Sequence, residues 1–176
     1  MEAPDEELML AYREGDAGAF ETLYKRHRGA LYRFIVRSLR ERAGAEELFQ
    51  EAWIRVIEAR GRYAPSARFT TWLYTIAHNL LVDHWRRKGL SLVQLDEELS
   101  LASPDNPARQ AEAREALGRL MQALEHLPHA QREAFLLHEE AGLSVAEIAA
   151  VTGAGEEAAK SRLRYAMAKL KATVDE

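Results

Sequence analysis

The last helical turns of the chain carry a run of basic side chains, although the formal net charge of the protein is −4. The cations are Lys160, Arg162, Arg164, Lys169 and Lys171, and no acidic residue lies between them. Spaced along a helix, such cations can contact the two phosphate strands that border a DNA groove. Glu156 and Glu157 precede them and could accept hydrogen bonds from base amino groups or complement the helix dipole. A solvated surface helix would show the same charge pattern, so both interpretations stay open.

A second cluster, over residues 60–88, combines aromatic and basic side chains. Its rings are Tyr63, Phe69, Trp72, Tyr74 and Trp85, and its cations are Arg60, Arg62, Arg68, Arg86, Arg87 and Lys88. Unpaired bases stack on aromatic rings, and cations hold the backbone of a single strand. The same rings could instead belong to a hydrophobic core, so the aromatic residues alone do not decide between these functions.

The stretch AEELFQEAW, residues 45–53, sets acidic side chains beside Leu48, Phe49 and Trp53. Apolar anchors with a charged rim are typical of a protein-binding surface. An ordinary amphipathic helix shows the same mixture, so this signal is open to both interpretations.

Metal binding and catalysis find little support in the residue types. The chain has no cysteine, and nothing completes a metal-binding set with His126, His129 and His138. No glycine-rich phosphate loop or nucleophile motif accompanies His78 and the neighbouring Asp83 and His84. We therefore expect no metal, no cofactor and no enzyme activity.

Helical periodicity predicts the elements that position the aromatic cluster. Apolar residues recur at helical spacing over residues 15–39, with Asp16 as the expected N-cap, and again over residues 43–61. Pro65 interrupts the pattern, and Ser66 is the expected cap of a third helix over residues 69–88. On that helix Trp72, Thr75, Asn79, Asp83 and Arg86 form a stripe beside the apolar face.

A different set of signals organises the C-terminal part. Residues 90–108 are acidic and interrupted by serine and proline, which predicts a linker, and helical patterns return over 109–127 and 128–141. Ser144 and Glu147 match a capping box, and Gly153 is expected to end the short helix that follows. The next helix would pack through Ala159, Leu163, Ala166 and Leu170. A short helix, a glycine turn and a longer helix predict a helix-turn-helix.

The whole pattern predicts an all-α protein with two helical modules joined by a flexible acidic linker. No apolar run is long enough to span a membrane, and the acidic N-terminus lacks the pattern of a signal peptide. A chain without cysteine fits a reducing cytoplasm. The isoelectric point near 5.9 argues against indiscriminate binding of nucleic acid, because excess acidic charge repels phosphate.

Four motifs occur in an order that resembles the bacterial extracytoplasmic-function (ECF) sigma factors of RNA polymerase. They are ALYRFIVRSLRERAGAEELFQEAWIRV, RYAPSARFTTWLYTIAHNLLVDHWRR, LPHAQREAFLLHEEAGLSVAEIAAVTG and AAKSRLRYAMAKL. The resemblance implies sigma region 2 over residues 1–89, a linker over 90–116, and a region 4 helix-turn-helix over 117–176. It also implies a cytoplasmic factor that binds the β′ clamp helices and β flap of core RNA polymerase and directs initiation at promoters by recognising and melting DNA.

The resemblance further implies roles for individual residues. Those facing core polymerase would be Glu46, Glu47, Leu48, Gln50, Glu51 and Trp53. Those binding the minus-10 element, partly as a single strand, would be Arg62, Tyr63, Ser66, Arg68, Phe69, Thr71, Trp72, Thr75, His78, Asn79, Arg86 and Arg87. Those reading the minus-35 element in duplex DNA would be Glu156, Glu157, Lys160, Ser161, Arg162, Arg164, Tyr165 and Lys169.

Two other functions stay open beside this one. A stand-alone helix-turn-helix regulator would bind duplex operators without polymerase, and an adaptor or anti-sigma-like module would bind only proteins. In the second case Lys160, Arg162 and Arg164 would be dispensable. An anti-sigma factor is a further partner that the family resemblance implies.

Overall fold

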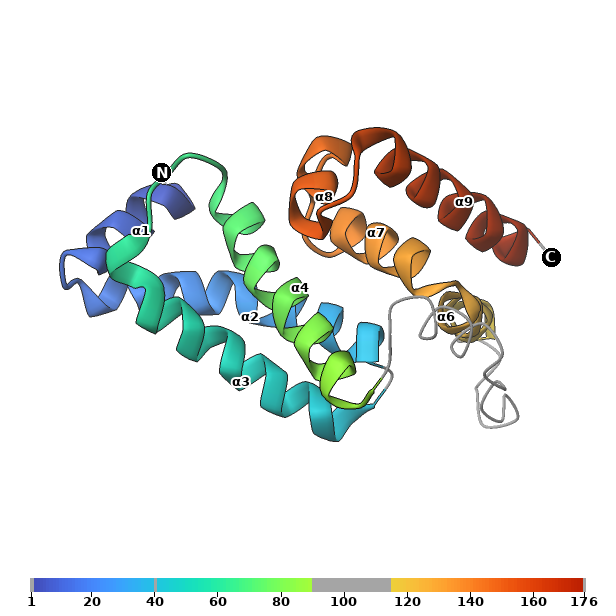
Figure 1. Cartoon of the computed structure of the whole chain (residues 1–176), viewed down its shortest axis with the longest axis horizontal. Helices are drawn as coiled ribbons and strands as arrows, with labels where there is room; N and C mark the ends of the chain where they lie inside the picture. The colour runs from blue at the N-terminus through green and yellow to red at the C-terminus, as the bar shows by residue number, and fades with distance from the viewer. Residues whose placement is uncertain (1, 40, 90–114, 176) are drawn as a thin grey trace.

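Figure 1 shows the computed structural model, which describes residues 2–39, 41–89 and 115–175. These residues form helices and no β-strand, which confirms the predicted all-α fold. The helices up to residue 89 make up what we call the N-terminal module, and those from residue 115 make up the C-terminal module. The predicted linker lies almost wholly outside the described residues, as does the first part of the helix predicted over 109–127.

Five elements build the N-terminal module and four build the C-terminal module. The first module contains α1 (Asp5–Arg13), α2 (Ala17–Leu39), α3 (Arg42–Ala59), a 3-10 turn η1 (Arg60–Arg62) and α4 (Phe69–Arg87). The second contains α6 (Glu115–His126), α7 (His129–Glu139), α8 (Val145–Thr152) and α9 (Glu156–Val174). None of the described helices combines the length and the apolar composition of a membrane span.

Local signals in the sequence set several helix ends as predicted. The carboxylate of Asp16 accepts a hydrogen bond from the backbone N–H of Ala19 at 3.2 Å, so it caps α2. Gly153, with φ of +74°, ends α8 in the left-handed conformation that glycine adopts most easily. Pro128 directly precedes the first residue of α7, where its fixed φ suits a helix start.

Helix α1 lies outside the helices that the periodicity predicts. Its first turn carries Asp5, Glu6 and Glu7, whose negative charges suit the positive end of the helix dipole. Met9 is fully buried and Tyr12 nearly so, and the helix packs against α2. The N-terminal module is therefore a four-helix unit rather than the three-helix unit that the sequence suggested.

The prediction that Ser66 caps α4 is wrong. The helix begins after Arg68, whose side chain makes no capping hydrogen bond. The carboxylate of Glu6 instead accepts a hydrogen bond from the backbone N–H of Phe69 at 2.9 Å. A residue of α1 thus satisfies one of the free amides at the start of α4.

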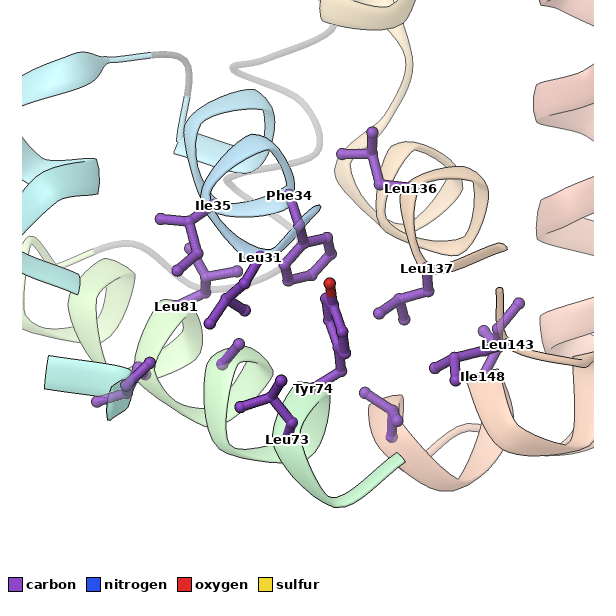
Figure 2. Close-up of a cluster of buried hydrophobic side chains, with 14 of the residues drawn as sticks. Leu31, Phe34, Ile35, Leu73, Tyr74, Leu81, Leu136, Leu137, Leu143 and Ile148 are labelled. Atoms are coloured by element: carbon purple, nitrogen blue, oxygen red, sulfur yellow. The ribbon is translucent and has the colours of Figure 1, made fainter. Parts of the chain in front are cut away.

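The two modules share one hydrophobic core. Helix α4 packs against α3 and α2 of its own module and against α8 of the other, and α2 also contacts α7 (Figure 1). Figure 2 shows Tyr74 of α4 in the middle of this core, with Phe34 of α2 on one side and Leu137 of α7 on the other. All three side chains are buried, and removal from water contributes about 1.5–3 kcal/mol for each of Phe34 and Leu137.

The C-terminal module packs α6, α7 and α8 against α9. A buried arginine helps to join its first two helices, because the Arg132 guanidinium donates hydrogen bonds to the carbonyl oxygens of Leu124 at 3.0 Å and Leu127 at 2.6 Å. These carbonyls lie in and just after the last turn of α6, where the carbonyls lack the acceptor pattern of the helix interior, and Arg132 supplies donors to them.

Candidate nucleic-acid interface

The loop over residues 63–68 is held at both ends by α1. At its first residue, the carbonyl oxygen of Tyr63 accepts a hydrogen bond from Arg13 at 3.0 Å. Just past its last residue, Glu6 binds the backbone N–H of Phe69. Between these anchors the side chains of Pro65, Ser66 and the remaining loop residues are exposed. The loop therefore presents polar and basic groups from a fixed frame.

Three aromatic rings pack together where this loop enters α4. The ring of Trp72 lies 5.1 Å from that of Tyr63 and 5.9 Å from that of Phe69. Tyr63 and Phe69 are buried, whereas Trp72 is partly exposed. Burial, followed by the charges of Glu6 and Asp5, raises the pKa of Tyr63 to about 12, so its hydroxyl stays protonated at neutral pH. In this conformation Trp72 is the ring of the three that solvent can reach.

The stripe predicted on α4 forms a continuous, at least partly exposed face. Trp72, Thr75 and Asp83 are half-buried, and Asn79 and Arg86 are exposed. The hydroxyl of Thr75 donates to the carbonyl of Thr71 at 2.7 Å, which fixes its rotamer. An aromatic ring, a hydroxyl and an amide thus follow one another along the helix, as a surface for unpaired bases requires, and the stripe ends in Asp83 and Arg86, which lie 3.8 Å apart as an ion pair.

The other residues predicted for the minus-10 element divide into two groups. Arg62, Ser66 and Arg87 are exposed to solvent. Arg68, Thr71 and His78 instead contact carboxylates of the C-terminal module. The first group is therefore free, whereas the C-terminal module covers Thr71 and His78 and pairs with Arg68, which stays exposed.

The predicted helix-turn-helix is present in the C-terminal module. Ser144 accepts a hydrogen bond from the Glu147 backbone N–H at 3.2 Å, and Glu147 accepts one from the Ser144 backbone N–H at 3.0 Å, which completes the predicted capping box. Helix α9 begins after Gly155 and turns Ala159, Ala166 and Leu170 into the module. The sequence signals for this motif are confirmed.

The outer face of α9 carries the residues predicted to read the minus-35 element. The exposed ones are Glu156, Glu157, Lys160, Arg164, Tyr165 and Lys169, and the half-buried ones are Ser161 and Arg162. Lys169 donates to the side-chain oxygen of Gln131 at 3.3 Å, which ties that end of the helix to α7. The two edges of the helix thus carry cations, with Tyr165, 57% exposed, between them.

Helix α3 presents the acidic residues predicted to face polymerase. Glu46, Glu47 and Gln50 are exposed, and Glu51 is half-buried beside Arg55. The predicted anchors Leu48 and Trp53 are instead buried in the module. Two residues that the sequence analysis did not select, Ile54 and Ile57, are the exposed apolar side chains of this helix.

A groove on the C-terminal module lies outside every sequence prediction. It has a volume of about 470 Å³ and is lined mainly by apolar side chains of α6, α7 and α9. Its lining includes Leu120, Phe135, Met167, Leu170 and Val174. Exposed Met167 and Val174 are the signal that could have located it, because apolar residues on the outside of an otherwise polar helix often mark an interface.

Two of the three histidines that the sequence analysis considered for metal binding, His126 and His138, contact backbone carbonyls. His126 contacts the carbonyl of Gln122 at 2.7 Å, and His138 contacts that of Leu143 at 3.2 Å. Within the described residues, no group of three or more His, Cys, Asp and Glu side chains has the arrangement of a metal site.

Polar contacts join the two modules where α4 and α2 meet α7 and α8. Glu140 accepts hydrogen bonds from Arg33 at 2.9 Å and from Arg37. Glu147 accepts them from Arg68 at 3.2 Å and from the Thr71 hydroxyl at 2.9 Å. We refer to this set of contacts, together with a buried pair between His78 and Glu133, as the seam.

The buried pair of the seam joins His78 Nδ1 to Glu133 at 2.7 Å. Burial alone would lower the pKa of His78, but the hydrogen bond and the negative charge of Glu133 outweigh it and raise the pKa. For Glu133 burial alone would raise the pKa, but the hydrogen bond from His78 and neighbouring positive charges lower it. Both groups therefore favour their charged forms, which makes this a buried ion pair.

A second histidine, His129, lies beside the seam but is neutral rather than charged. The ring of His129 lies 4.0 Å from that of Trp85 of α4, edge to face. Neither of its ring nitrogens has a hydrogen-bond partner in the described part of the chain. Burial lowers the pKa of His129 to about 4, so the ring is neutral at pH 7. The seam residues Glu133 and Glu140 match no motif, so sequence reasoning did not identify them, and it considered His129 only for metal binding.

Comparisons with known families agree with the two-module organisation. Residues 23–90 match the family model for Sigma-70 region 2, and residues 117–170 match that for Sigma-70, region 4. RNA polymerase sigma factor CarQ of Myxococcus xanthus is 36% identical over 171 residues, which cover 96% of each chain. ECF RNA polymerase sigma factor SigM of Mycobacterium tuberculosis is 31% identical over 170 residues, which cover 96% of this chain and 84% of SigM.

Solved structures show the same fold. CnrH, in complex with the cytosolic domain of CnrY, superimposes with a TM-score of 0.69 at 27% identity over 97% of both chains. The sigma factor RpoE of Bartonella quintana, in complex with the anti-sigma factor NepR, also gives 0.69. Its identity is 24%, over 89% of this chain and 96% of RpoE, so that likeness supports the fold alone.

Proposed function

This chain belongs to the extracytoplasmic-function group of the sigma-70 family and is a promoter-specificity factor, and we propose which of its surfaces carry out each step of initiation. It would act by binding rather than by catalysis, in the cytoplasm where polymerase and promoter DNA meet. The observation that carries the proposal is the pairing of two different surfaces in one chain. One is the aromatic and polar face of α4, and the other is the basic outer face of α9.

The α4 face would hold the minus-10 element after its strands separate. Trp72 offers a partly exposed ring on a packed aromatic base, and Thr75 and Asn79 offer hydrogen bonds next to it. Exposed Arg62 and Arg86 would attract the phosphates at either end of this face. Stacking on such a ring stabilises an unpaired base by about 1–3 kcal/mol, which offsets much of the cost of unstacking it.

The α9 face would read the minus-35 element in the major groove. Its exposed cations Lys160, Arg164 and Lys169 suit the phosphates that border the groove, and Glu156 and Glu157 lead the helix into it. The capping box fixes the start of α8 and Gly153 ends it, so the turn at Gly153 leads directly into α9 and its outer face. The proposed boundaries of the functional parts are 1–89 for region 2, 90–116 for the linker and 117–176 for region 4.

Core polymerase would bind two further surfaces. The rim of Glu46, Glu47 and Gln50 on α3 suits a basic partner such as the β′ clamp helices, with exposed Ile54 and Ile57 as apolar contacts beside it. The apolar groove between α6, α7 and α9 would accept an apolar segment of the β flap. The family resemblance adds an anti-sigma factor as a partner that would compete for such surfaces.

Transcription in vitro tests the proposal as a whole. The purified chain and core polymerase are incubated with a library of promoters, and we expect initiation on a subset that shares minus-35 and minus-10 elements. Measurable binding to core polymerase without initiation on any member would point to the adaptor function. Tight binding to duplex operators without polymerase would point to a stand-alone regulator.

A variant of Trp72 tests the assignment of the α4 face. Trp72→Ala should leave binding to core polymerase intact and weaken the open complex by about 1–3 kcal/mol, because a stacking partner is lost. Permanganate reactivity of unpaired thymines measures the opening. Trp72→Phe is the matched control, because it keeps a ring, and it should retain most of the reactivity. Equal opening by Trp72→Ala and the unmodified chain would place the melting surface elsewhere.

A further inference from the structure

We propose that Glu140 and Glu147 of the C-terminal module occupy positions that DNA phosphates take when the modules separate, and that Arg33 and Arg37 are consequently DNA-backbone contacts of the N-terminal module. The proposal rests on the function proposed above. It adds two residues of α2 to the nucleic-acid surface, and it makes closure of the modules and binding of DNA compete for the same cations.

The polarity of the seam is the first observation that supports it. In the part of the chain that the structure describes, every ion pair between the modules has its cation in the N-terminal module and its carboxylate in the C-terminal module. The hydroxyl of Thr71 follows the same rule, since it donates to Glu147. Such complementarity is common where two protein surfaces meet. Here it means that separation of the modules exposes a side of the N-terminal module that carries only the cations of these pairs, which suits a polyanion.

The position of Glu140 is the second observation. It follows directly on the last residue of α7, at the negative end of the helix dipole, where an acidic side chain is unfavourable by itself. Its side chain is only 11% exposed, and Arg33 and Arg37 provide the compensating charge. Both arginines lie on α2 at a spacing of four residues, so they form one face of that helix.

The geometry of α4 connects that face to the predicted minus-10 surface. Arg68, Thr71 and His78 contact the C-terminal module, while Trp72 and Thr75 lie on the adjoining face of the same helix. Phe34, which follows Arg33, packs on Tyr74 of α4 with the ring centroids 5.3 Å apart (Figure 2). Arg33, Arg37 and Arg68 therefore belong to the side of the N-terminal module that faces the C-terminal module. On α4, Thr71 and His78 lie between the Trp72 face and Tyr74, so a strand would reach Arg33 and Arg37 from that face by crossing the surface that separation of the modules exposes.

The exposed fractions of the three arginine side chains agree with an exchange of their carboxylate partners for phosphates. The side chains of Arg33, Arg37 and Arg68 remain 51%, 31% and 54% exposed even in the closed arrangement. Separating the modules removes the carboxylates and leaves three guanidinium groups without their acidic partners. Guanidinium binds phosphate with the same paired geometry that it uses for carboxylate, so a phosphate backbone is a matched replacement.

The test separates opening of the modules from binding of DNA. Because the chain has no cysteine, Glu21→Cys on α2 and Ala172→Cys on α9 provide two exposed labelling sites for fluorescence energy transfer. Glu140→Gln removes the carboxylate, and Arg33→Gln with Arg37→Gln removes the cations. Glu139→Gln is the matched control for the first variant, and Lys25→Gln with Arg28→Gln is the matched control for the second.

We expect both seam variants to open the labelled chain to a similar extent, and both controls to stay closed. A mixed-sequence fork DNA is the probe, since phosphate contacts do not depend on sequence. Glu140→Gln should bind it about fivefold more tightly than the unmodified chain, because its arginines are released. The double arginine variant should bind about tenfold more weakly than Glu140→Gln, although both are open. For the double arginine variant, the slope of log K for DNA binding against log salt concentration should be less steep by about 1.4–1.8, because two phosphate contacts are lost.

Two results would overturn the inference. One is equally tight DNA binding by the double arginine variant and Glu140→Gln, which would make the seam a mechanical latch only. The other is a closed state in both seam variants, verified with folded modules by circular dichroism. Failure of the proposed function would look different, because the unmodified chain and core polymerase would then fail to initiate on any promoter. The fork DNA and energy-transfer measurements do not use that assay.

Discussion

Helices α4 and α9 are the two elements assigned to DNA, and they are built in opposite ways. Both have 19 residues, but ten of those in α4 are buried and only three in α9, which are Ala159, Ala166 and Leu170. Helix α4 lies between the core of its own module and helix α8 of the other (Figure 1). Helix α9 packs on one side and presents the rest of its surface to solvent.

The difference separates two strategies for binding nucleic acid. A helix that reads a duplex groove needs one packed face and one free face, and α9 has these in any arrangement of the modules. A helix that holds unpaired bases needs a wide and rigid surface, which α4 obtains by being packed on several sides. The cost is that the C-terminal module can cover part of α4, as it does at Thr71 and His78.

The largest expected effect comes from removing a core side chain of α4. Leu73 is fully buried, so Leu73→Ala should lower the free energy of unfolding of the N-terminal module by about 2–5 kcal/mol. Leu163 is the matched position on α9 and is only partly buried, so Leu163→Ala should lower the stability of the C-terminal module by about 1 kcal/mol. Calorimetric unfolding of both variants measures these values. Equal losses would mean that α9 is as deeply packed as α4.

A smaller effect should follow from acidification, through His129 at the edge of α4. The pKa of this residue is about 4 in the closed arrangement, because it is buried, with the ring of Trp85 against its own. Separation of the modules lets the pKa return toward 6.5, so the open form binds more protons below that pH. His129 therefore favours opening as pH falls from about 6.5 to 4, by about 2 kcal/mol at pH 5.

Protonation of His78 has the opposite effect, because it stabilises the closed arrangement. Its pKa is raised in the closed arrangement, so its stabilisation is complete below about pH 6.5 and is lost as pH rises through the raised value. Glu133, Arg132 and Arg162 are the other charged groups around these rings. Energy transfer between labelled modules should show weaker closure at pH 5 than at pH 7. In His129→Leu this loss should disappear, and an unchanged acid response would exclude His129 as its origin.

The smallest expected effect concerns the local cap at the start of α8. Ser144→Ala removes the local cap of α8 and should lower the stability of the C-terminal module by about 1 kcal/mol, with no change in the N-terminal module. Denaturant unfolding, followed by separate probes of the modules, measures this loss. Ser144→Thr keeps the hydroxyl and serves as the control. A loss of similar size in the N-terminal module would show that the cap acts across the seam.

The same contrast explains what the sequence could predict. The α8–α9 motif depends on neighbours in the chain, since Ser144 and Glu147 are three residues apart and Gly153 acts alone, and all three predictions are confirmed. The start of α4 depends on Glu6, far away in the sequence, and the local candidate Ser66 was wrong. Periodicity and capping are local signals, so they describe α9 well and α4 only in part.

Burial of charge is the second limit of sequence reasoning. Glu133 and Glu140 lie in a helix that reads as an ordinary polar surface, and nothing in their spacing marks a contact with His78 or Arg33. Such pairs exist because two modules meet, and the sequence of each module alone carries no record of that. The residues proposed for the minus-10 and minus-35 elements stay predictions, while the helices that carry them are confirmed.

The hydrogen bond from Phe69 to Glu6 makes the choice of start codon a matter of structure. A polypeptide begun at the internal Met9 would keep both stretches that match the family models, from residue 23 onward, and every helix assigned to DNA. It would lack Glu6 at the entry of α4, and also Asp5, which binds Arg26 at 3.0 Å and His27 at 2.8 Å. The family models would match the shorter product equally well, although it would keep only one of the two anchors of the loop over residues 63–68, the one from Arg13 to Tyr63.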